Sequence, residues 1–270
     1  VLCVLCASAA SEDARLVTAP SYANLSPHVA LPPFLEDRLA YYNSFESADG
    51  RPEVNSVDAQ HGAKITRSEA GVLGRGTATG KSGEIHLRSP AFSPHRPLSV
   101  LFWWALQEDA RIDGGFRLFH LTNGRGFVSH FSRGKGDWCA LERPAGVLQV
   151  YHFPGIRDVN GIYDHDLLKR LDLKAGVWHH TALTFSGGSV ISLYTDGAPT
   201  FKIHLKGRSF TEADAIHELL IGSRGGTPTC VDEVLILQRL LTADDIASYV
   251  QAVRQMREAR YPLGAPAGAR

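Results

Sequence analysis

Two adjacent carboxylates stand directly before an uninterrupted apolar run near the end of the sequence. Asp232 and Glu233 precede Val234–Leu237 in the stretch VDEVLIL. Side chains alternate between the two faces of a strand, so we expect Asp232 to share a face with Val234, and Glu233 to share one with Leu235. A carboxylate buried among apolar side chains needs a hydrogen-bond donor, a basic partner or a metal ion. The chemistry open to this pair is therefore amide capture, ion pairing or cation binding.

A second acidic group, formed by Glu212, Asp214 and Glu218, comes near the spacing used in glycoside hydrolysis. A retaining glycosidase needs two carboxyl groups about 5 to 5.5 Å apart, which E-x-D-x-E or E-x-D-x-x-E on one strand supplies. Here the last glutamate falls one place late, and His217 stands where a carboxylate is needed. We therefore expect no catalysis from this group.

The twelve histidines invite a metal-binding interpretation, but their spacing does not favour one. His179 and His180 are adjacent, so on a strand they face opposite ways and cannot hold one ion together. His86, His120 and His130 each lie singly in a strand pattern, as a hydrogen-bonded sheet histidine does. The sequence predicts no transition-metal site.

The elements that would position these residues are short strands. Segments rich in β-branched and aromatic residues alternate with clusters of Gly, Asn, Asp and Ser. The longest are 98–106 (LSVLFWWAL) and 177–185 (VWHHTALTF), and tight turns at 186–188 and 196–197 make 177–205 a three-stranded meander. One helix is expected after Thr242, with an apolar stripe that ends at Val253. The pattern predicts an all-β protein with two sheets.

The length, the charge balance and the first ten residues limit the classes of protein to which the chain can belong. The chain has 270 residues and balances 28 basic against 28 acidic ones, without a Lys/Arg-rich run, so we expect no nucleic-acid partner. Residues 1–10 (VLCVLCASAA) resemble the end of a secretory signal peptide, because Ala7-Ser8-Ala9 fits a cleavage site. No stretch is long and apolar enough for a transmembrane segment. We expect a secreted protein, or one at the periplasm or cell surface.

Two cysteines remain once the first ten residues are set aside. Cys139 and Cys230 lie 91 positions apart. A disulfide between them and two separate buried thiols are both open, because export permits the first and free cysteine is commonly buried.

The block VDEVLILQRLLTADDI resembles the C-terminal signature of laminin-G-like jelly-roll domains, which belong to the concanavalin A-like lectin/glucanase superfamily. AYYNSFE, LSVLFWWAL and VWHHTALTFSGGSVISLYTDGAP are similar to its other conserved blocks, and the likeness extends over roughly residues 38–250. The resemblance implies a two-sheet antiparallel jelly-roll sandwich, concanavalin A-like, with one short C-terminal helix. It also implies that the strand with Asp232 runs beside the first strand.

Two explanations remain for how the buried carboxylates of Asp232 and Glu233 are satisfied beside the first strand. In the first, Asp232 or Glu233 accepts backbone N–H groups or pairs with Arg239. In the second, a structural Ca²⁺ ion is held by Asp232 together with Glu46 and Asp49 of the early segment, since calcium takes six to eight oxygen ligands.

A binding site is expected in loops or on an exposed sheet face. Residues 132–138 (SRGKGDW) place Lys135, Asp137 and Trp138 together, and an indole beside polar groups suits a sugar ring. Residues 154–170 form a long predicted loop that carries Tyr163 and Asp164.

Together these features predict a non-catalytic extracellular binding or adhesion module, with a carbohydrate or another extracellular surface as its ligand and calcium as its cofactor. The alternatives are a glycoside hydrolase of the jelly-roll glucanase type and a structural domain of a larger exported protein. We expect the end of a signal peptide at 1–10, a Pro-rich linker or arm at 11–37, the sandwich at 38–260 and a tail at 261–270.

Overall fold

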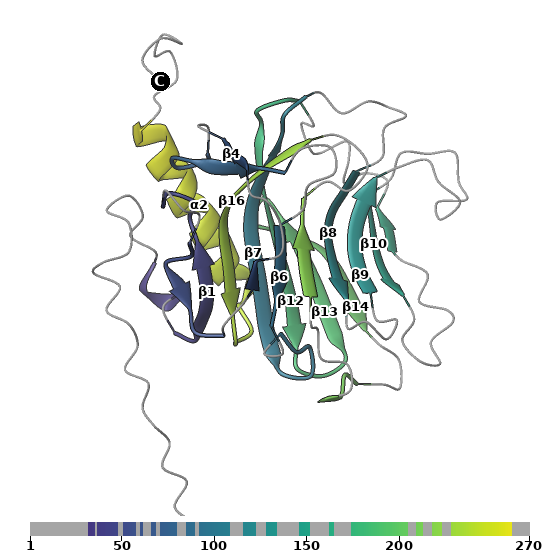
Figure 1. Cartoon of the computed structure of the whole chain (residues 1–270). Coiled ribbons are helices and arrows are strands. Elements are labelled where there is room, and N and C mark those ends of the chain that lie inside the picture. The colour runs from purple at the N-terminus through teal and green to yellow at the C-terminus, as the bar shows by residue number, and fades with distance from the viewer. Residues whose placement is uncertain are drawn as a thin grey trace, which may run out of the picture.

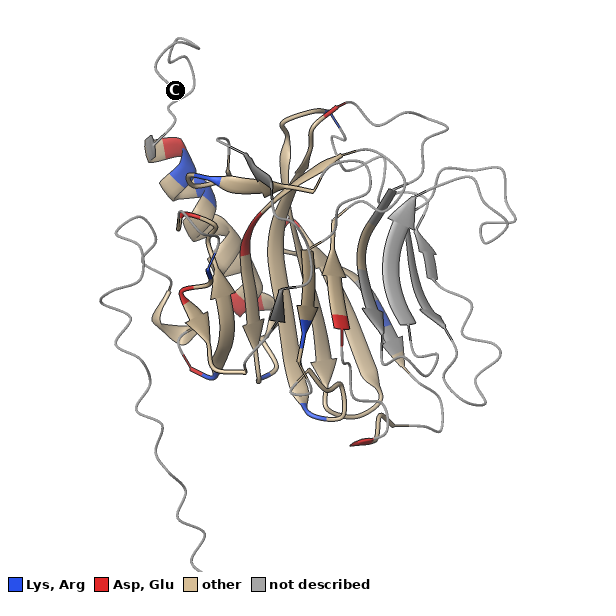
Figure 2. Ribbon diagram, viewed as in Figure 1, with Lys and Arg blue, Asp and Glu red and all other residues tan. Residues whose placement is uncertain are grey.

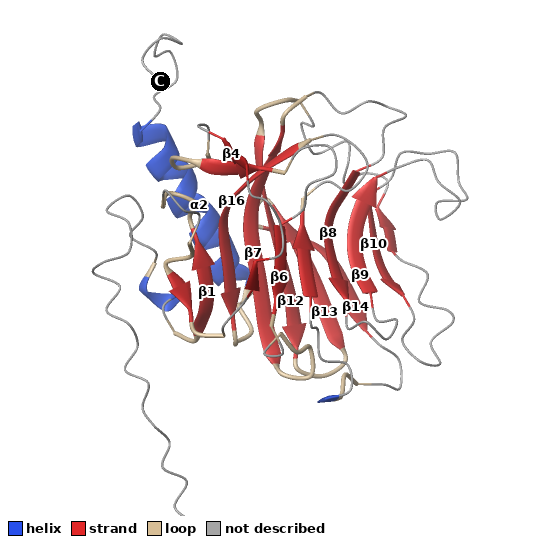
Figure 3. Cartoon of the chain, in the orientation of Figure 1, coloured by secondary structure: helices blue, strands red, loops and turns tan. Residues whose placement is uncertain are grey.

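The computed structural model describes a sandwich of two antiparallel sheets with one long helix (Figures 1 and 3). The described residues are 32–35, 37–47, 51–57, 60–61, 66–68, 71–79, 85–89, 92–108, 116–122, 128–133, 146–151, 162–164, 174–204, 209–212, 218–222 and 228–260. Every structural statement below concerns these residues.

Sheet A contains the longest described strands. Its members are β1 (Leu39–Asn43), β2 (Val54–Asn55), β4 (Thr66–Ser68), β5 (Gly76–Ala78), β7 (Pro97–Leu106), β12 (Trp178–Ser186), β13 (Val190–Thr195), β14 (Ala198–His204) and β16 (Thr229–Leu237). The order across the sheet is β14-β13-β12-β7-β16-β1-β2, while β5 pairs with both β16 and β4. The predicted meander is confirmed in β12, β13 and β14.

Sheet B faces sheet A across the main core. Its members are β3 (Gln60–His61), β6 (Ile85–Arg88), β8 (Phe116–Thr122), β9 (Val128–Arg133), β10 (Gly146–Tyr151), β11 (Ile162–Asp164) and β15 (Glu218–Ile221). The order is β11-β10-β9-β8-β15-β6-β3. Because β11 is a strand, the prediction of one continuous loop over 154–170 is wrong.

Helix α2 (Ala243–Arg260) covers the face of sheet A that points away from sheet B (Figure 1). Thr242 caps it, since its hydroxyl accepts the N–H of Asp245 at 3.1 Å while the Asp245 carboxylate accepts the N–H of Thr242 at 2.9 Å. The helix is longer than predicted, because the polar residues beyond Val253 continue it to Arg260. A 3₁₀ turn, η2 (Pro33–Leu35), buries Leu35 in the same layer, so the end of the predicted arm packs onto the domain.

Two hydrophobic clusters result. The first lies between the sheets and includes Phe102, Trp104, Leu183, Phe119 and Ile221. The second lies between sheet A and α2, and contains Tyr42, Trp103, Leu235, Ile246 and Tyr249 among others. Sheet A is therefore buried on both faces, which explains the near-continuous apolar runs in β7 and β16.

Candidate functional site

The acidic pair lies at a bulge in the middle of β16, where Figure 2 shows it as a red segment. Glu233 has a φ of 52°, and the pairing of β16 with β7 shifts register between Asp232 and Leu235. The extra residue interrupts the alternation, so that Val231 and Val234 both reach the first cluster. Our expectation that Asp232 shares a face with Val234 is therefore wrong.

Asp232 is fully buried and receives backbone N–H groups. Its Oδ2 accepts the amide of Val72 at 2.8 Å and that of Leu73 at 3.4 Å, and its Oδ1 accepts the amide of Glu233 at 2.9 Å. A Cβ on Gly71 would lie 2.5 Å from Oδ2, so glycine permits this close approach. The amide-capture explanation is confirmed.

The basic partner that the sequence suggested lies elsewhere. Arg239 places Nη1 3.7 Å from the Oδ2 atom of Asp37, so pairing of Arg239 with the acidic pair was wrong. The reason is the position of Arg239 after the end of β16, whereas the carboxylates lie at the bulge within the strand.

Glu233 is buried and accepts a hydrogen bond from another buried side chain. The hydroxyl of Tyr42 donates to its Oε2 at 2.8 Å. Burial raises the pKa of Glu233 to about 8, although the Tyr42 bond acts to lower it. Burial and the nearby Glu233 also raise the pKa of Asp232, against its amide bonds. Both carboxyl groups therefore bind a proton more tightly in the fold than in the unfolded chain, and the two titrate as an interacting pair.

Two of the three predicted calcium ligands, Glu46 and Asp232, contact the same loop, residues 71–75. Glu46 Oε1 accepts the amide of Arg75 at 2.7 Å, so Glu46 and Asp232 hold the two ends of the loop 71–75. Asp49 lies outside the described residues. Within the described part of the chain, no group of three His, Cys, Asp or Glu side chains could hold a metal ion. The described carboxylates are thus too few to hold a calcium ion by themselves. Calcium binding stays a prediction.

The histidines of β12 separate as expected. His180 lies under α2, with its ring centroid 5.3 Å from that of Trp103 and 5.4 Å from that of Tyr249. Burial lowers the pKa of His180 to about 3, so the ring stays neutral. The two nitrogens of His180 have no hydrogen-bond partner among the described residues. This cluster stabilises by packing and offers no accessible base.

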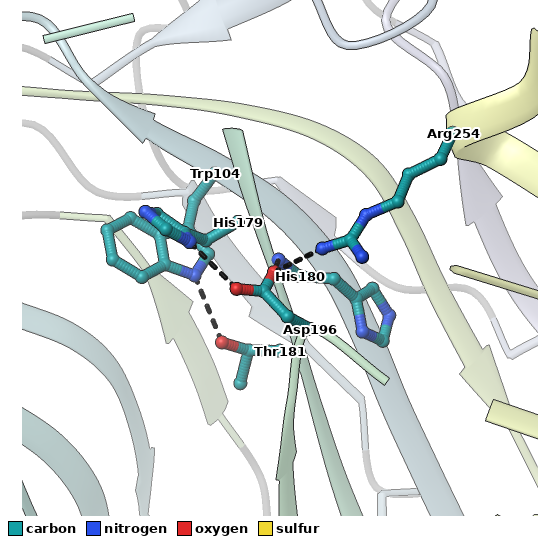
Figure 4. Close-up of polar contacts among 6 residues, drawn as sticks. All are labelled: Trp104, His179, His180, Thr181, Asp196 and Arg254. Carbon is teal, nitrogen blue, oxygen red and sulfur yellow. Dashed lines mark hydrogen bonds and ion pairs between the residues drawn. The ribbon is translucent and has the colours of Figure 1, made fainter. Parts of the chain in front are cut away.

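Asp196 connects three elements at one point (Figure 4). It lies in the turn between β13 and β14, where Asp196 and Gly197 have φ of 52° and 85°. Its Oδ1 accepts the amide of His180 at 2.9 Å and lies 3.4 Å from Nη2 of Arg254 on α2. Its Oδ2 bonds Nδ1 of His179 at 2.9 Å. The carboxylate therefore ties the turn to β12 and to the helix.

We expect Asp196→Ala to lower the free energy of unfolding by about 2 to 3 kcal/mol, because it removes two hydrogen bonds and a residue suited to positive φ. Burial alone would raise the pKa of Asp196, but the bonds from His179 and His180 outweigh it and hold the pKa below its ordinary value. This contribution is present above the ordinary aspartate pKa and is lost as pH falls through the lower folded pKa. Urea unfolding at pH 7 and pH 3 measures it, and equal losses at both would contradict the assignment.

The predicted ligand-binding residues fall in different places. Tyr163 and Asp164 lie on β11, the edge strand of sheet B, opposite Val147 and Gly146. Lys135, Asp137 and Trp138 lie outside the described residues, as does Cys139, the predicted partner of the buried Cys230. The disulfide and the 132–138 site stay predictions.

A polar group lies on the outer face of sheet B, where the structure brings His86 and Glu218, which the sequence analysis treated separately, together with Arg88. On β6, Ile85 and Leu87 point into the first cluster, whereas His86 is half-buried and Arg88 is exposed. Glu218 of β15 pairs with Arg88 across the strands. The alternation of the stretch IHLR was the signal that could have identified this face.

Comparison with known proteins agrees with this architecture. The two antiparallel sheets define a β-sandwich. The chain belongs to the concanavalin A-like lectin/glucanases superfamily, whose family profile matches residues 79–247, and the resemblance to laminin-G-like domains is confirmed. No curated protein matches the sequence.

Solved structures share the fold at low sequence identity. Domain 4 of AbnA, a GH43 extracellular arabinanase from Geobacillus stearothermophilus solved with arabinotriose, is 17% identical, with a TM-score of 0.57 over 79% of this chain and 98% of that domain. The binding domain of botulinum neurotoxin serotype D is 12% identical, with a TM-score of 0.56 over 80% of this chain and 51% of that one. Another structure of the serotype D domain contains N-acetylneuraminic acid, at 13% identity and a TM-score of 0.54 over 80% of this chain and 51% of that one. This chain spans about half the length of the neurotoxin domains.

Across the described residues, no helix has the length and apolar character needed to span a membrane.

Proposed function

We propose that this chain is a non-catalytic carbohydrate-binding module of an exported protein. The observation that supports it most is the contrast between the two sheets. Sheet A is covered on both faces, whereas sheet B presents polar and charged side chains such as Arg88 and Glu218 on its outer face. Sugar-binding neighbours with the same fold, one of them a domain of an extracellular enzyme, agree with this function and with export.

The geometry favours binding over hydrolysis. The adjacent carboxyl groups of Asp232 and Glu233 are 0% and 1% exposed, so a substrate cannot reach them. Of the other acidic group, Glu212 is exposed and Glu218 is held by Arg88, while Asp214 lies outside the described residues. A hydrolase would need two carboxyl groups facing one substrate-accessible position.

An array of neutral and sialylated oligosaccharides, run once with calcium and once with chelator, tests this function. We expect retention of at least one oligosaccharide, which chromatography then recovers uncleaved after prolonged incubation. Cleavage would support the hydrolase alternative. Retention of no oligosaccharide in either condition would contradict carbohydrate binding and favour the structural-domain alternative.

Calcium is the cofactor that we propose, held by Glu46, Asp49 and Asp232. The expected result is a rise in melting temperature on adding calcium, reversed by chelator and absent in Asp49→Asn. Asp244→Asn, on the exposed first turn of α2, is the matched control and should keep the rise. An unchanged melting temperature of the wild-type protein in calcium and chelator would refute the proposal.

A further inference from the structure

The outer face of sheet B carries a described group of three polar side chains. Glu218 Oε1 accepts Nε of Arg88 at 3.0 Å and lies 3.5 Å from Nδ1 of His86. The side chains are 62% exposed for Arg88, 28% for His86 and 22% for Glu218. Exposed ion pairs of this kind add little to stability, so the group is not required by the fold.

The three side chains can form hydrogen bonds with the hydroxyl groups of a sugar ring. A guanidinium offers several N–H donors in a fixed plane, a carboxylate accepts, and an imidazole can do either. Adjacent sugar hydroxyls both donate and accept, so they can bond such a group at two points. Because Glu218 already orients Arg88, less side-chain entropy is lost when a ligand binds.

Strand register extends this face across the sheet. Leu220, next along β15 on the same face as Glu218, is only 6% exposed and pairs with His86 on one side and His120 on the other, so the open part of the face begins at His86, Arg88 and Glu218. His120 pairs with His130, which in turn pairs with Gln149 on β10.

A second row runs parallel to the first. Glu218 pairs with Arg88 and with Thr122, Thr122 pairs with Val128, and Val128 pairs with Tyr151. By register, the two rows place hydrogen-bonding residue types at most positions of one sheet face, with the apolar Leu220 and Val128 between them.

We propose that the outer face of sheet B, centred on His86, Arg88 and Glu218, binds a neutral oligosaccharide laid across the strands. This inference rests on the proposed function and names the site and the ligand class. The described charges determine the class, because the carboxylate of Glu218 already compensates the guanidinium of Arg88. An anionic sugar would have to displace Glu218 or approach it.

The test compares Arg88→Ala and Glu218→Gln with wild type on the array of neutral and sialylated oligosaccharides. Lys202→Ala is the matched control, since Lys202 is an exposed basic residue on β14 of the other sheet. We expect Arg88→Ala to weaken binding of a neutral oligosaccharide at least tenfold and Glu218→Gln to weaken it less, because glutamine still accepts a hydrogen bond. Lys202→Ala should bind as wild type, and thermal melting should show all three variants folded.

Three results would overturn the proposal in different ways. Unchanged binding by Arg88→Ala places the site elsewhere and leaves the proposed function intact. Retention of sialylated oligosaccharides alone contradicts the ligand class. Retention of nothing by wild type removes the proposed function, and this site with it.

Discussion

Asp232→Ala is expected to lower the free energy of unfolding by on the order of 3 to 5 kcal/mol. The alanine leaves the amides of Val72, Leu73 and Glu233 without their acceptor in a buried site, and each such loss costs about 1 to 3 kcal/mol. Because a buried carboxyl group is costly to desolvate, its removal offsets part of that cost. Urea unfolding at pH 7 measures the change.

Two further variants make this result specific. Asp232→Asn keeps one oxygen for the loop amides and should lose roughly half as much. Asp244→Ala makes the same deletion on the exposed first turn of α2, where the loss should stay below about 1 kcal/mol. If Asp232→Ala is no less stable than Asp244→Ala, the carboxylate does not hold the loop 71–75.

The second large effect is a dependence of stability on pH that Glu233 controls. Its pKa is about 8 in the fold, against an ordinary value of 4.5, because burial disfavours the charged form. Between these values the folded protein binds a proton that the unfolded chain has released, so stability falls as pH rises from about 4.5 to 8. Below 4.5 the full contribution is present, and above 8 it is lost.

Glu233→Gln should reduce this dependence and leave the part that the raised pKa of Asp232 causes, since glutamine keeps the shape and still accepts the Tyr42 hydroxyl. We expect the variant to match wild type near pH 4.5 and to exceed it by on the order of 3 to 5 kcal/mol at pH 8 and above. Glu258→Gln, at an exposed position of α2, should follow the wild-type curve. Parallel curves for wild type and Glu233→Gln, measured by urea unfolding from pH 4.5 to 9, would show that Glu233 does not retain its proton.

The main strands could be predicted because their residue patterns are strong. The apolar and aromatic runs of β7 and β12 and the turn at Asp196-Gly197 are local signals, and the stripe from Ile246 to Val253 has a clear helical period. The pairing of β16 with β1 followed from the family resemblance, and the register of Tyr42 opposite Leu235 confirms it.

The surroundings of the acidic pair could not be predicted in detail. Simple alternation assigns Asp232 and Glu233 to opposite faces, whereas the bulge at Glu233 depends on how β16 meets β7. The loop 71–75 has no strand or helix pattern, so its role as a donor to Asp232 comes only from the tertiary fold. Short strands such as β2 and β11 are fixed by their neighbours and have no sequence signal of their own.

The candidate binding face was missed for a related reason. Alternation in the stretch from Ile85 to Arg88 separates two faces but does not say which one the rest of the chain covers. In the structure α2 covers the outer face of sheet A, whereas Arg88 on the outer face of sheet B is 62% exposed. The sequence therefore predicted a site in loops, whereas Arg88 and Glu218 meet on adjacent strands.

We propose a division of roles, in which the buried acidic pair holds the fold and sheet B binds the ligand. The most direct test is the dissociation constant of Glu233→Gln at pH 6 for the oligosaccharide that the array selects, measured by titration calorimetry beside wild type. We predict equal affinities within about twofold, because a buried side chain under α2 does not contact the ligand. A loss of tenfold or more in a folded Glu233→Gln protein would contradict the claim.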